Sequence, residues 1–282
     1  MNPHFRLFHR LPALGTVAMS ATLAFVTLSL HAQEKKKNPS SKIYVASMEG
    51  QSQINQDDKI ADLTQKSAYN AEGSVIETKP KSTNAMVYSN GTGIFFDPDT
   101  RVEVKKFIQE PFTPNRNDME VEPSISQTEG VVSHGTIGLC TSKLVAGSTM
   151  NYRTSLGSVS IRGGKIVIQA EPESTKISML EGESTVRGGT LDLGGQVLHA
   201  GEQAVIKPGP PGAPNVIKIG KIPDADRSSL DDKVLMACAA KKTVYFETNG
   251  RGPNADPEIV PVPVVPATLP VPITISPAKL PD

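Results

Sequence analysis

Four carboxylates gather in a short stretch of this 282-residue chain: Glu171, Glu173, Glu181 and Glu183. Two carboxyl groups that face each other across about 5 to 10 Å can hydrolyse a glycosidic bond. These four instead flank two predicted turns, one of them at Gly182, where solvated acids are common. Aromatic residues make up 5% of the chain and Trp is absent, whereas sugar clefts usually present aromatic side chains. We therefore predict that the chain is not an enzyme, with a carboxylate hydrolase as a third alternative.

Nucleophile and metal patterns are also missing around the histidines and cysteines. His134 adjoins Ser133, but neighbouring side chains on a strand point to opposite faces, and no GxSxG elbow is present. His199 lies in a strand-like run, which predicts a hydrogen-bonded core or edge residue. Neither Cys140 nor Cys238 has a CxxC neighbour or a nearby histidine, so we predict no catalytic residue, no metal and no cofactor.

The two cysteines leave two interpretations open. If Cys140 and Cys238 form a disulfide, the closed loop is long, and in the chain-entropy model the bond stabilises the fold by about 4 to 5 kcal/mol. Alternatively, both are buried thiols that act as small apolar side chains. The sequence does not show whether their Cβ atoms approach each other.

Composition and charge exclude several classes of protein. Lys and Arg number 29 and Asp and Glu number 29, so the formal net charge is zero. A strongly basic nucleic-acid binder is excluded, and we predict no nucleic-acid partner. Gly and Pro stand at 23 each without a repeat, and no series of long apolar runs is present, which excludes a collagen and a multi-span membrane protein.

The N-terminus has the pattern of a secretory signal peptide over residues 1–32. A basic start is followed by an uncharged run, Ala13–Leu30, and by a small residue, Ala32. The alternative is an uncleaved membrane anchor, because the run is near the lower limit for a spanning helix. Both predict that the rest of the chain is periplasmic or secreted. Membrane contact is expected only if the segment is uncleaved, and residues 33–41 are predicted to be a flexible linker.

Residues 42–222 read as one domain of short β segments with a turn every 8 to 12 residues, which predicts an all-β, multi-stranded sandwich or β-helix-like fold. Asn90-Gly91 is a strong hairpin signal, because both residues tolerate positive φ. Residues 109–122 are polar and proline-rich, and are expected to form a surface loop. The predicted strands cover residues 42–47, 73–78, 84–89, 94–97, 101–108, 149–153, 158–162, 165–170, 176–180, 190–193, 196–199, 203–207 and 215–222.

Residues 223–249 are predicted to form one short helix and a closing segment. Ser228 or Ser229 can cap the helix, with acids in its first turn and lysines at its end. Its apolar face is expected to pack on the sheet, and it comprises Leu230, Val234, Leu235 and Cys238.

Residues 250–282 hold nine prolines and are predicted to form neither a helix nor a β ladder. Two interpretations remain: an ordinary disordered tail, or an extended segment that docks the domain to a partner in the cell envelope.

Three blocks of sequence resemble the FecR domain, the periplasmic domain of the ferric-citrate sensor family. The first runs Gly73-Ser-Val-Ile-Glu-Thr78, then Asn84-Ala-Met-Val-Tyr-Ser-Asn-Gly-Thr-Gly93, then Pro98-Asp-Thr100. The second is Tyr152-Arg-Thr-Ser-Leu-Gly-Ser-Val-Ser-Ile-Arg-Gly163, and the third joins Ser178-Met-Leu-Glu-Gly182 to Leu198-His-Ala-Gly-Glu-Gln203. The motif positions are Gly73, Thr78, Gly91, Thr154, Gly157, Arg162, Gly163, Gly182 and Gly201.

The resemblance implies an exported β domain whose motif residues are structural and in which the family supplies no catalytic or metal-binding residue. Arg162 is expected to hydrogen-bond turn carbonyls. Only ten residues, ending at Arg10, precede the point where the uncharged sequence begins, so we expect a stand-alone member without an anti-sigma segment. The predicted function is a non-catalytic binding or signalling module in the envelope, with a protein or a glycan as partner. The alternative is a structural scaffold docked through its Pro-rich tail.

Overall fold

The computed structural model describes residues 41–112, 120–248 and 257–261. The chain divides into residues 1–35 and 36–282, and all described residues belong to the second unit. The predicted signal peptide, the linker up to residue 40 and most of the Pro-rich tail lie outside the described residues. In the part that the structure describes, no helix combines the length and the apolar character needed to cross a membrane.

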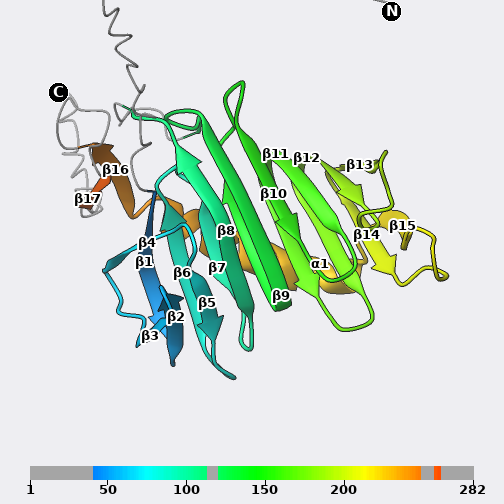
Figure 1. Cartoon of the computed structure of the whole chain (residues 1–282), viewed down its shortest axis with the longest axis horizontal. Coiled ribbons are helices and arrows are strands. Elements are labelled where there is room, and N and C mark those ends of the chain that lie inside the picture. The colour runs from blue at the N-terminus through cyan, green and yellow to red at the C-terminus, as the bar shows by residue number, and fades with distance from the viewer. Residues whose placement is uncertain (1–40, 113–119, 249–256, 262–282) are drawn as a thin grey trace, which may run out of the picture. The chain divides into compact units, whose positions relative to one another are not determined.

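The described residues are mainly strands, with one helix near the end (Figure 1). The elements are β1 (Lys42–Glu49), β2 (Ser52–Gln56), β3 (Lys59–Asp62), β4 (Ala68–Asn70), β5 (Val75–Thr78), β6 (Thr83–Tyr88), β7 (Gly93–Phe96), β8 (Arg101–Gln109), β9 (Ser126–Thr141), β10 (Thr149–Arg153), β11 (Ser158–Ala170), β12 (Thr175–Arg187), β13 (Gln196–His199), β14 (Glu202–Lys207), β15 (Val216–Lys221), α1 (Asp224–Lys241), β16 (Val244–Thr248) and β17 (Pro257–Pro261).

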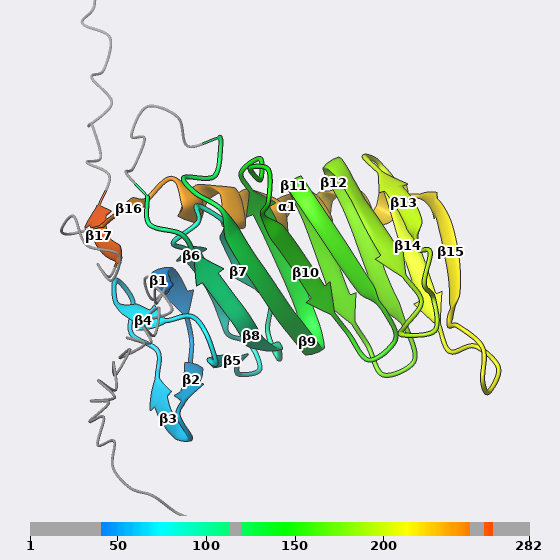
Figure 2. The same ribbon diagram turned by 45° about the horizontal axis from the view of Figure 1, so that its top comes forward.

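Strands β1 to β15 form one hydrogen-bonded sheet that wraps into a two-layer sandwich. The first layer, called the helix-side layer, has the order β4-β1-β6-β7-β9-β11-β12-β14-β15. The second, called the open layer, has the order β3-β2-β5-β8-β9-β10-β11-β12-β13. Strands β9, β11 and β12 belong to both, and Figure 2 shows these long strands in the middle of the sheet. The predicted all-β sandwich is confirmed.

Glycines stand where the long strands turn from one layer into the other. Strand β9 pairs with β8 and β10 up to His134, and with β7 and β11 from Gly135 onward. Gly135 has φ +90°, and the corner of β11 is made by Gly163 and Gly164 at φ +142° and +107°. Residues that carry a Cβ rarely adopt such positive φ angles, so glycine is the residue that permits the corner. The second half of β9 lies in the helix-side layer, so β10 can re-enter the open layer after a short connection. There β10 pairs parallel to the first half of β9.

The main core fills the space between the two layers. Alternate residues of each strand point inward, as in β8, where Val102, Val104 and Phe107 are buried. A bulge between Val104 and Lys106 shifts the alternation by one residue. The largest buried side chains of this core include Tyr88, Phe96 and Tyr152. Deep burial raises the pKa of Tyr88 to about 12.

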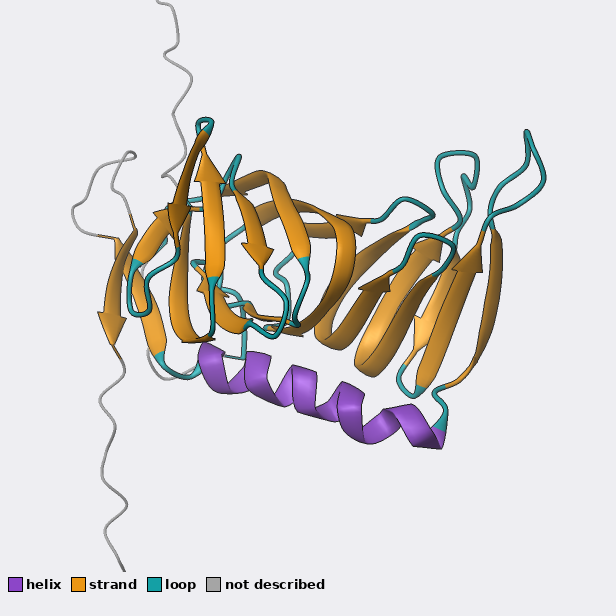
Figure 3. Cartoon of the chain, turned by 90° about the horizontal axis from the view of Figure 1, so that it is seen from below, coloured by secondary structure: helices purple, strands orange, loops and turns teal. Residues whose placement is uncertain are grey.

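Two smaller clusters of buried residues lie between the helix-side layer and α1, which runs along that layer (Figure 3). The helix begins at Asp224 after Pro223, one turn before the predicted serine caps, because Asp224 and Asp226 supply the acidic first turn. Leu230 and Val234 are buried as predicted, but Leu235 is 64% exposed. Successive helical residues differ by about 100°, so Leu235 turns away from the face that holds Val234.

A disulfide joins the helix to the sheet. Cys140 of β9 and Cys238 of α1 are bonded with their Cα atoms 5.1 Å apart, across 98 residues of sequence. In the chain-entropy model a loop of this length stabilises the fold by about 4.7 kcal/mol. The bond therefore holds α1 against the helix-side layer.

Several sequence predictions differ from the structure. Residues 190–193 form a loop rather than a strand, because hydrogen bonds to Asp192 hold the chain in a turn. Glu122, predicted in a surface loop, is buried. Residues 257–261 form β17 and pair with β16, although the Pro-rich segment was expected to build no ladder. The prolines of β17 stand at its two ends, and the three residues between them retain their N–H groups.

Candidate binding site

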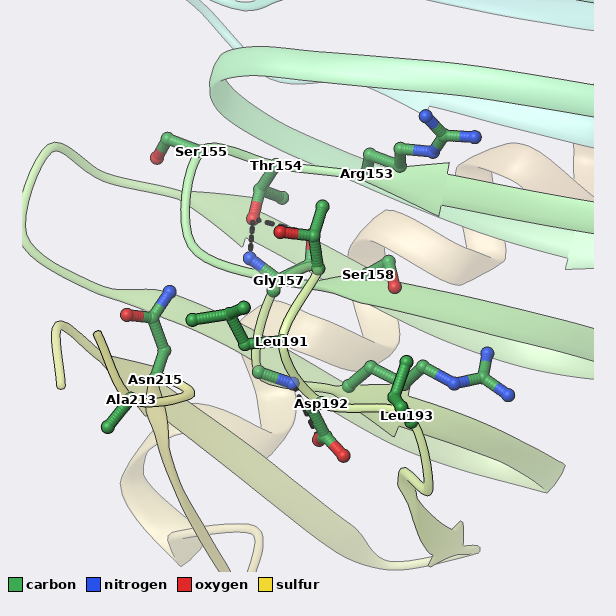
Figure 4. Close-up of a pocket in the computed structure, with 14 residues that line it drawn as sticks. Arg153, Thr154, Ser155, Gly157, Ser158, Leu191, Asp192, Leu193, Ala213 and Asn215 are labelled. Carbon is green, nitrogen blue, oxygen red and sulfur yellow. Dashed lines mark hydrogen bonds between the residues drawn. The ribbon is translucent and has the colours of Figure 1, made fainter.

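A pocket of about 590 Å³ lies at one end of the sandwich, where three connections meet (Figure 4). The connections are the β10–β11 turn, the β12–β13 loop and the β14–β15 loop. The lining consists of Arg153, Thr154, Ser155, Gly157, Ser158, Arg187, Gly188, Gly189, Thr190, Leu191, Asp192, Leu193, Ala213 and Asn215.

The β10–β11 turn is closed by a threonine. Thr154 Oγ1 accepts hydrogen bonds from the N–H groups of Leu156 at 3.3 Å and Gly157 at 3.1 Å. The same oxygen lies 2.8 Å from Thr175 Oγ1 on β12. A Cβ on Gly157 would lie 2.6 Å from the carbonyl oxygen of Arg187, so the turn packs directly on the neighbouring strand. Thr154 and Gly157, two of the motif positions, thus form one wall of the pocket.

Asn215 joins all three connections. Its side-chain N–H donates to the carbonyl of Leu156 at 2.6 Å, and its backbone N–H donates to the carbonyl of Gly188 at 2.8 Å. Its Oδ1 accepts from the N–H of Gly209 at 3.1 Å. These bonds hold the pocket walls in one arrangement.

Asp192 organises the β12–β13 loop. Its carboxylate accepts hydrogen bonds from the backbone N–H groups of Gly188 and Gly195, both at 2.9 Å. The Gly188 bond, followed by the Gly195 bond, lowers the pKa of Asp192 below its ordinary value of 3.8, so the group is ionised at neutral pH. The loop carries Leu191, which is 57% exposed, and Leu193, which is 90% exposed.

Two arginines line the pocket with a serine between them. Arg153 of β10 pairs in register with Ser158 of β11, which pairs with Arg187 of β12. Lateral neighbours in a sheet have their side chains on the same face, so both guanidinium groups rise beside Ser158. Arg153 lies 3.4 Å from the carboxylate of Glu129, and both are partly exposed. The positive charge of Arg187 makes a small further contribution to the lowered pKa of Asp192, after the hydrogen bonds from the backbone.

The other motif residues lie away from this pocket, at turns and corners. Thr78 is buried, donates to the carbonyl of Asp97 at 2.6 Å and accepts from the N–H of Thr100 at 2.9 Å. Arg162 is exposed, and no hydrogen bond joins its guanidinium to the described residues, so the expected bond to turn carbonyls is not formed there. Gly73, Gly91, Gly163, Gly182 and Gly201 all have positive φ.

The four carboxylates considered for hydrolysis are exposed, and two of them form ion pairs. Glu181 lies 2.5 Å from Lys165, and Glu171 lies 3.7 Å from Lys176. His134 lies 3.8 Å from Asp99 on the surface, and His199 is an exposed residue of the edge strand β13. The described residues contain no group of three or more His, Cys, Asp and Glu side chains placed to hold a metal ion.

A second cavity of about 780 Å³ lies between α1 and the helix-side layer, beside the disulfide. Its walls are charged by the Lys165 and Glu181 pair and by Asp231 and Asp232 of the helix. The cavity follows the seam where the helix packs on the sheet. We therefore take the loop-built pocket as the candidate site.

Sequence reasoning missed the main residues of this pocket, which are Arg153, Arg187, Leu191, Asp192 and Leu193. One signal was present: Thr-Leu-Asp-Leu stands between two glycine pairs, Gly188-Gly189 and Gly194-Gly195. Glycines on both sides favour a loop over a strand, and apolar residues on a loop are candidates for contact with a partner.

Comparison with known proteins finds similarity only to solved structures, with three matching chains. No family model and no curated protein match the sequence. Two crystal structures of candidate anti-sigma factors from Parabacteroides distasonis ATCC 8503 are similar to the chain, at 16% and 15% identity and TM-scores of 0.39 and 0.38. Each match covers 55% of this chain and 62% of the other, so the chain spans less than two thirds of the length of those proteins.

Proposed function

We propose that the chain is an exported, FecR-like binding module that recognises a partner in the cell envelope without catalysis. Export rests on the signal-peptide pattern of residues 1–32, and the family on the three motif blocks. Binding rests on the pocket, whose walls are held rigid by Thr154, Asn215 and Asp192. Loops that are positioned by a rigid sheet are common places for recognition.

One observation carries the binding role: two residues that line this pocket, Leu191 and Leu193, are large, apolar and exposed. Leu191 and Leu193 stand on its loop, Val216 follows its residue Asn215, and Val197 lies on the strand after the loop. These four are half of the large exposed apolar residues among those that the structure describes. Exposed apolar side chains beside polar groups, such as those of Leu191 and Leu193, are typical of a contact surface.

The test uses the exported protein and a matched control. We expect L191S/L193S to abolish specific capture of an envelope component by the immobilised domain. L235S changes a leucine of similar exposure on α1, and we expect it to leave capture intact. Equal capture by both variants would contradict the assignment of the pocket, and recovery of the intact protein from the cytosol would contradict export.

One observation supports the alternative function, a structural scaffold that is docked through its Pro-rich tail. The start of the Pro-rich segment is tied to the domain by the ladder between β16 and β17. If the segment docks the domain, deletion of residues 262–282 should release the protein from the envelope fraction while pocket-dependent capture persists. Retention after the deletion argues against the scaffold.

A further inference from the structure

We propose that the loop-built pocket takes an extended, acidic and aliphatic polypeptide segment of a partner protein, with its carboxylates held by Arg153 and Arg187. The inference rests on the proposed binding function and names its ligand class. Neither the motif blocks nor the comparisons assign a ligand to these residues.

The two arginines form a clamp over a small, polar floor. They lie two strands apart with Ser158 between them, and neighbouring strands are about 4.8 Å apart, so their Cα atoms are separated by about 10 Å. Both side chains are long enough to turn toward a group placed above Ser158. Acidic side chains at positions i and i+2 of an extended peptide lie about 7 Å apart on one face, which suits this spacing. Guanidinium groups bind carboxylates with two parallel hydrogen bonds.

The acidic side chains near the pocket, Asp192 and Glu129, do not prevent the two arginines from binding a further carboxylate. The carboxylate oxygens of Asp192 are each engaged by a backbone N–H, from Gly188 and Gly195. Glu129 contacts Arg153 at 3.4 Å in a partly exposed pair, and exposed pairs of this kind contribute little to stability because water screens them. An incoming carboxylate can therefore replace Glu129 at little cost. Arg187 forms no salt bridge with the described residues.

The apolar side chains favour a peptide over an acidic glycan. Leu191 points into the middle of the pocket between Asn215 and Gly157, while Leu193 stands at the rim (Figure 4). Aliphatic side chains of a peptide would bury these leucines, and burial of apolar surface contributes about 25 cal/mol per Å². The lining holds no aromatic side chain, whereas sugar rings are usually stacked on aromatic faces. Charge and apolar contact together describe an acidic segment with aliphatic neighbours.

The experiment selects ligands from a displayed library of random 12-residue peptides, using the full exported domain as bait. Selected peptides are synthesised and their affinity is measured by fluorescence anisotropy for the wild type, R153Q, R187Q and L193S. R162Q is the control, since Arg162 is an exposed arginine outside this pocket whose guanidinium forms no ion pair with the described part of the chain. Circular dichroism confirms that each variant is folded. Polygalacturonate is measured in parallel as an acidic glycan.

We expect the selected peptides to combine acids with aliphatic residues, and R153Q or R187Q to weaken binding at least tenfold. R162Q should bind like the wild type, and added salt should weaken binding by the wild type. Peptides without acids, or affinity unchanged in R187Q, would overturn the inference. Arginine-dependent binding of polygalacturonate without any peptide would overturn the ligand class and leave the binding function standing. If envelope capture also fails, the proposed function fails with it.

Discussion

Glu122 is a buried acid that joins three parts of the fold, and its replacement should destabilise the domain measurably. The residue is 3% exposed. Its carboxylate accepts hydrogen bonds from the Ser126 hydroxyl, from the Asn90 side chain at 3.4 Å and from the Val145 N–H at 3.3 Å. These groups belong to the β6–β7 turn, the start of β9 and the β9–β10 connection. E122A would leave the Ser126 hydroxyl and the Val145 N–H without an acceptor.

The size of the loss follows from those two donors. A buried polar group without a partner costs about 1 to 3 kcal/mol, so we expect E122A to reduce the free energy of unfolding by about 3 kcal/mol. In a domain of this size, that corresponds to a fall in Tm of about 6 to 12 °C. E122Q keeps one acceptor oxygen and should lose about 1 kcal/mol. Asn90 still donates to Ser126 at 3.1 Å in either variant.

The pH dependence gives a second, independent signature. Burial raises the pKa of Glu122 above its ordinary value of 4.5, and the hydrogen bonds from Ser126, Ser148, Val145 and Asn90 only partly oppose the effect. The folded state therefore binds the proton more tightly than the unfolded state. The resulting stabilisation is complete below pH 4.5 and is lost as the pH rises through the folded pKa. The advantage of the wild type over E122Q should shrink in that direction.

Thermal unfolding of wild type, E122A, E122Q and the control E173A, measured from pH 4 to 8, tests both parts. Glu173 is an exposed turn acid, so E173A should melt like the wild type. If E122A also melts like E173A, the carboxylate does not join these segments. If wild type and E122Q keep a constant difference across the pH range, the raised pKa is wrong.

Two further predictions concern the disulfide and a layer corner. Replacing Cys140 and Cys238 together by serine should lower the free energy of unfolding by about 4 kcal/mol, measured by urea denaturation, and reductant should then have no further effect. An unchanged midpoint would show that α1 is held by packing alone. G164A should abolish folding, because a Cβ there would lie 2.0 Å from the carbonyl oxygen of Glu181. G220A has open space around its Cβ and should fold normally, and a folded G164A would contradict the corner geometry.

Local signals in the sequence account for most of the strands. Alternation of polar and apolar residues located β1, β8 and β10 closely, and Asn90-Gly91 marked the β6–β7 hairpin. Strands β2, β3, β4 and the long β9 were not predicted. Strands β3 and β4 are short and largely exposed, so burial imposes no alternation on them. The sequence predicts the start of the helix about one turn too late. It favours Ser228 or Ser229 as the cap, whereas the helix begins after Pro223 with Asp224 and Asp226 in its first turn.

The candidate site was harder to predict than the fold. Arg153, Ser158 and Arg187 are far apart in sequence and share a row only because β10, β11 and β12 pair in one register. Leu191 and Leu193 read as strand residues, since alternating leucines fit a half-buried strand. In the structure, hydrogen bonds from the N–H groups of Gly188 and Gly195 to the Asp192 carboxylate hold this segment as a loop.

The sequence alone determined a β domain punctuated by glycines, one amphipathic helix and two cysteines that could meet, because propensity and alternation act over a few residues. The tertiary structure decided that three strands wrap between layers, that Cys140 reaches Cys238, and that an arginine pair faces exposed leucines across a pocket. Those features depend on register between segments distant in the chain, and strand register is set by the packing of the whole core.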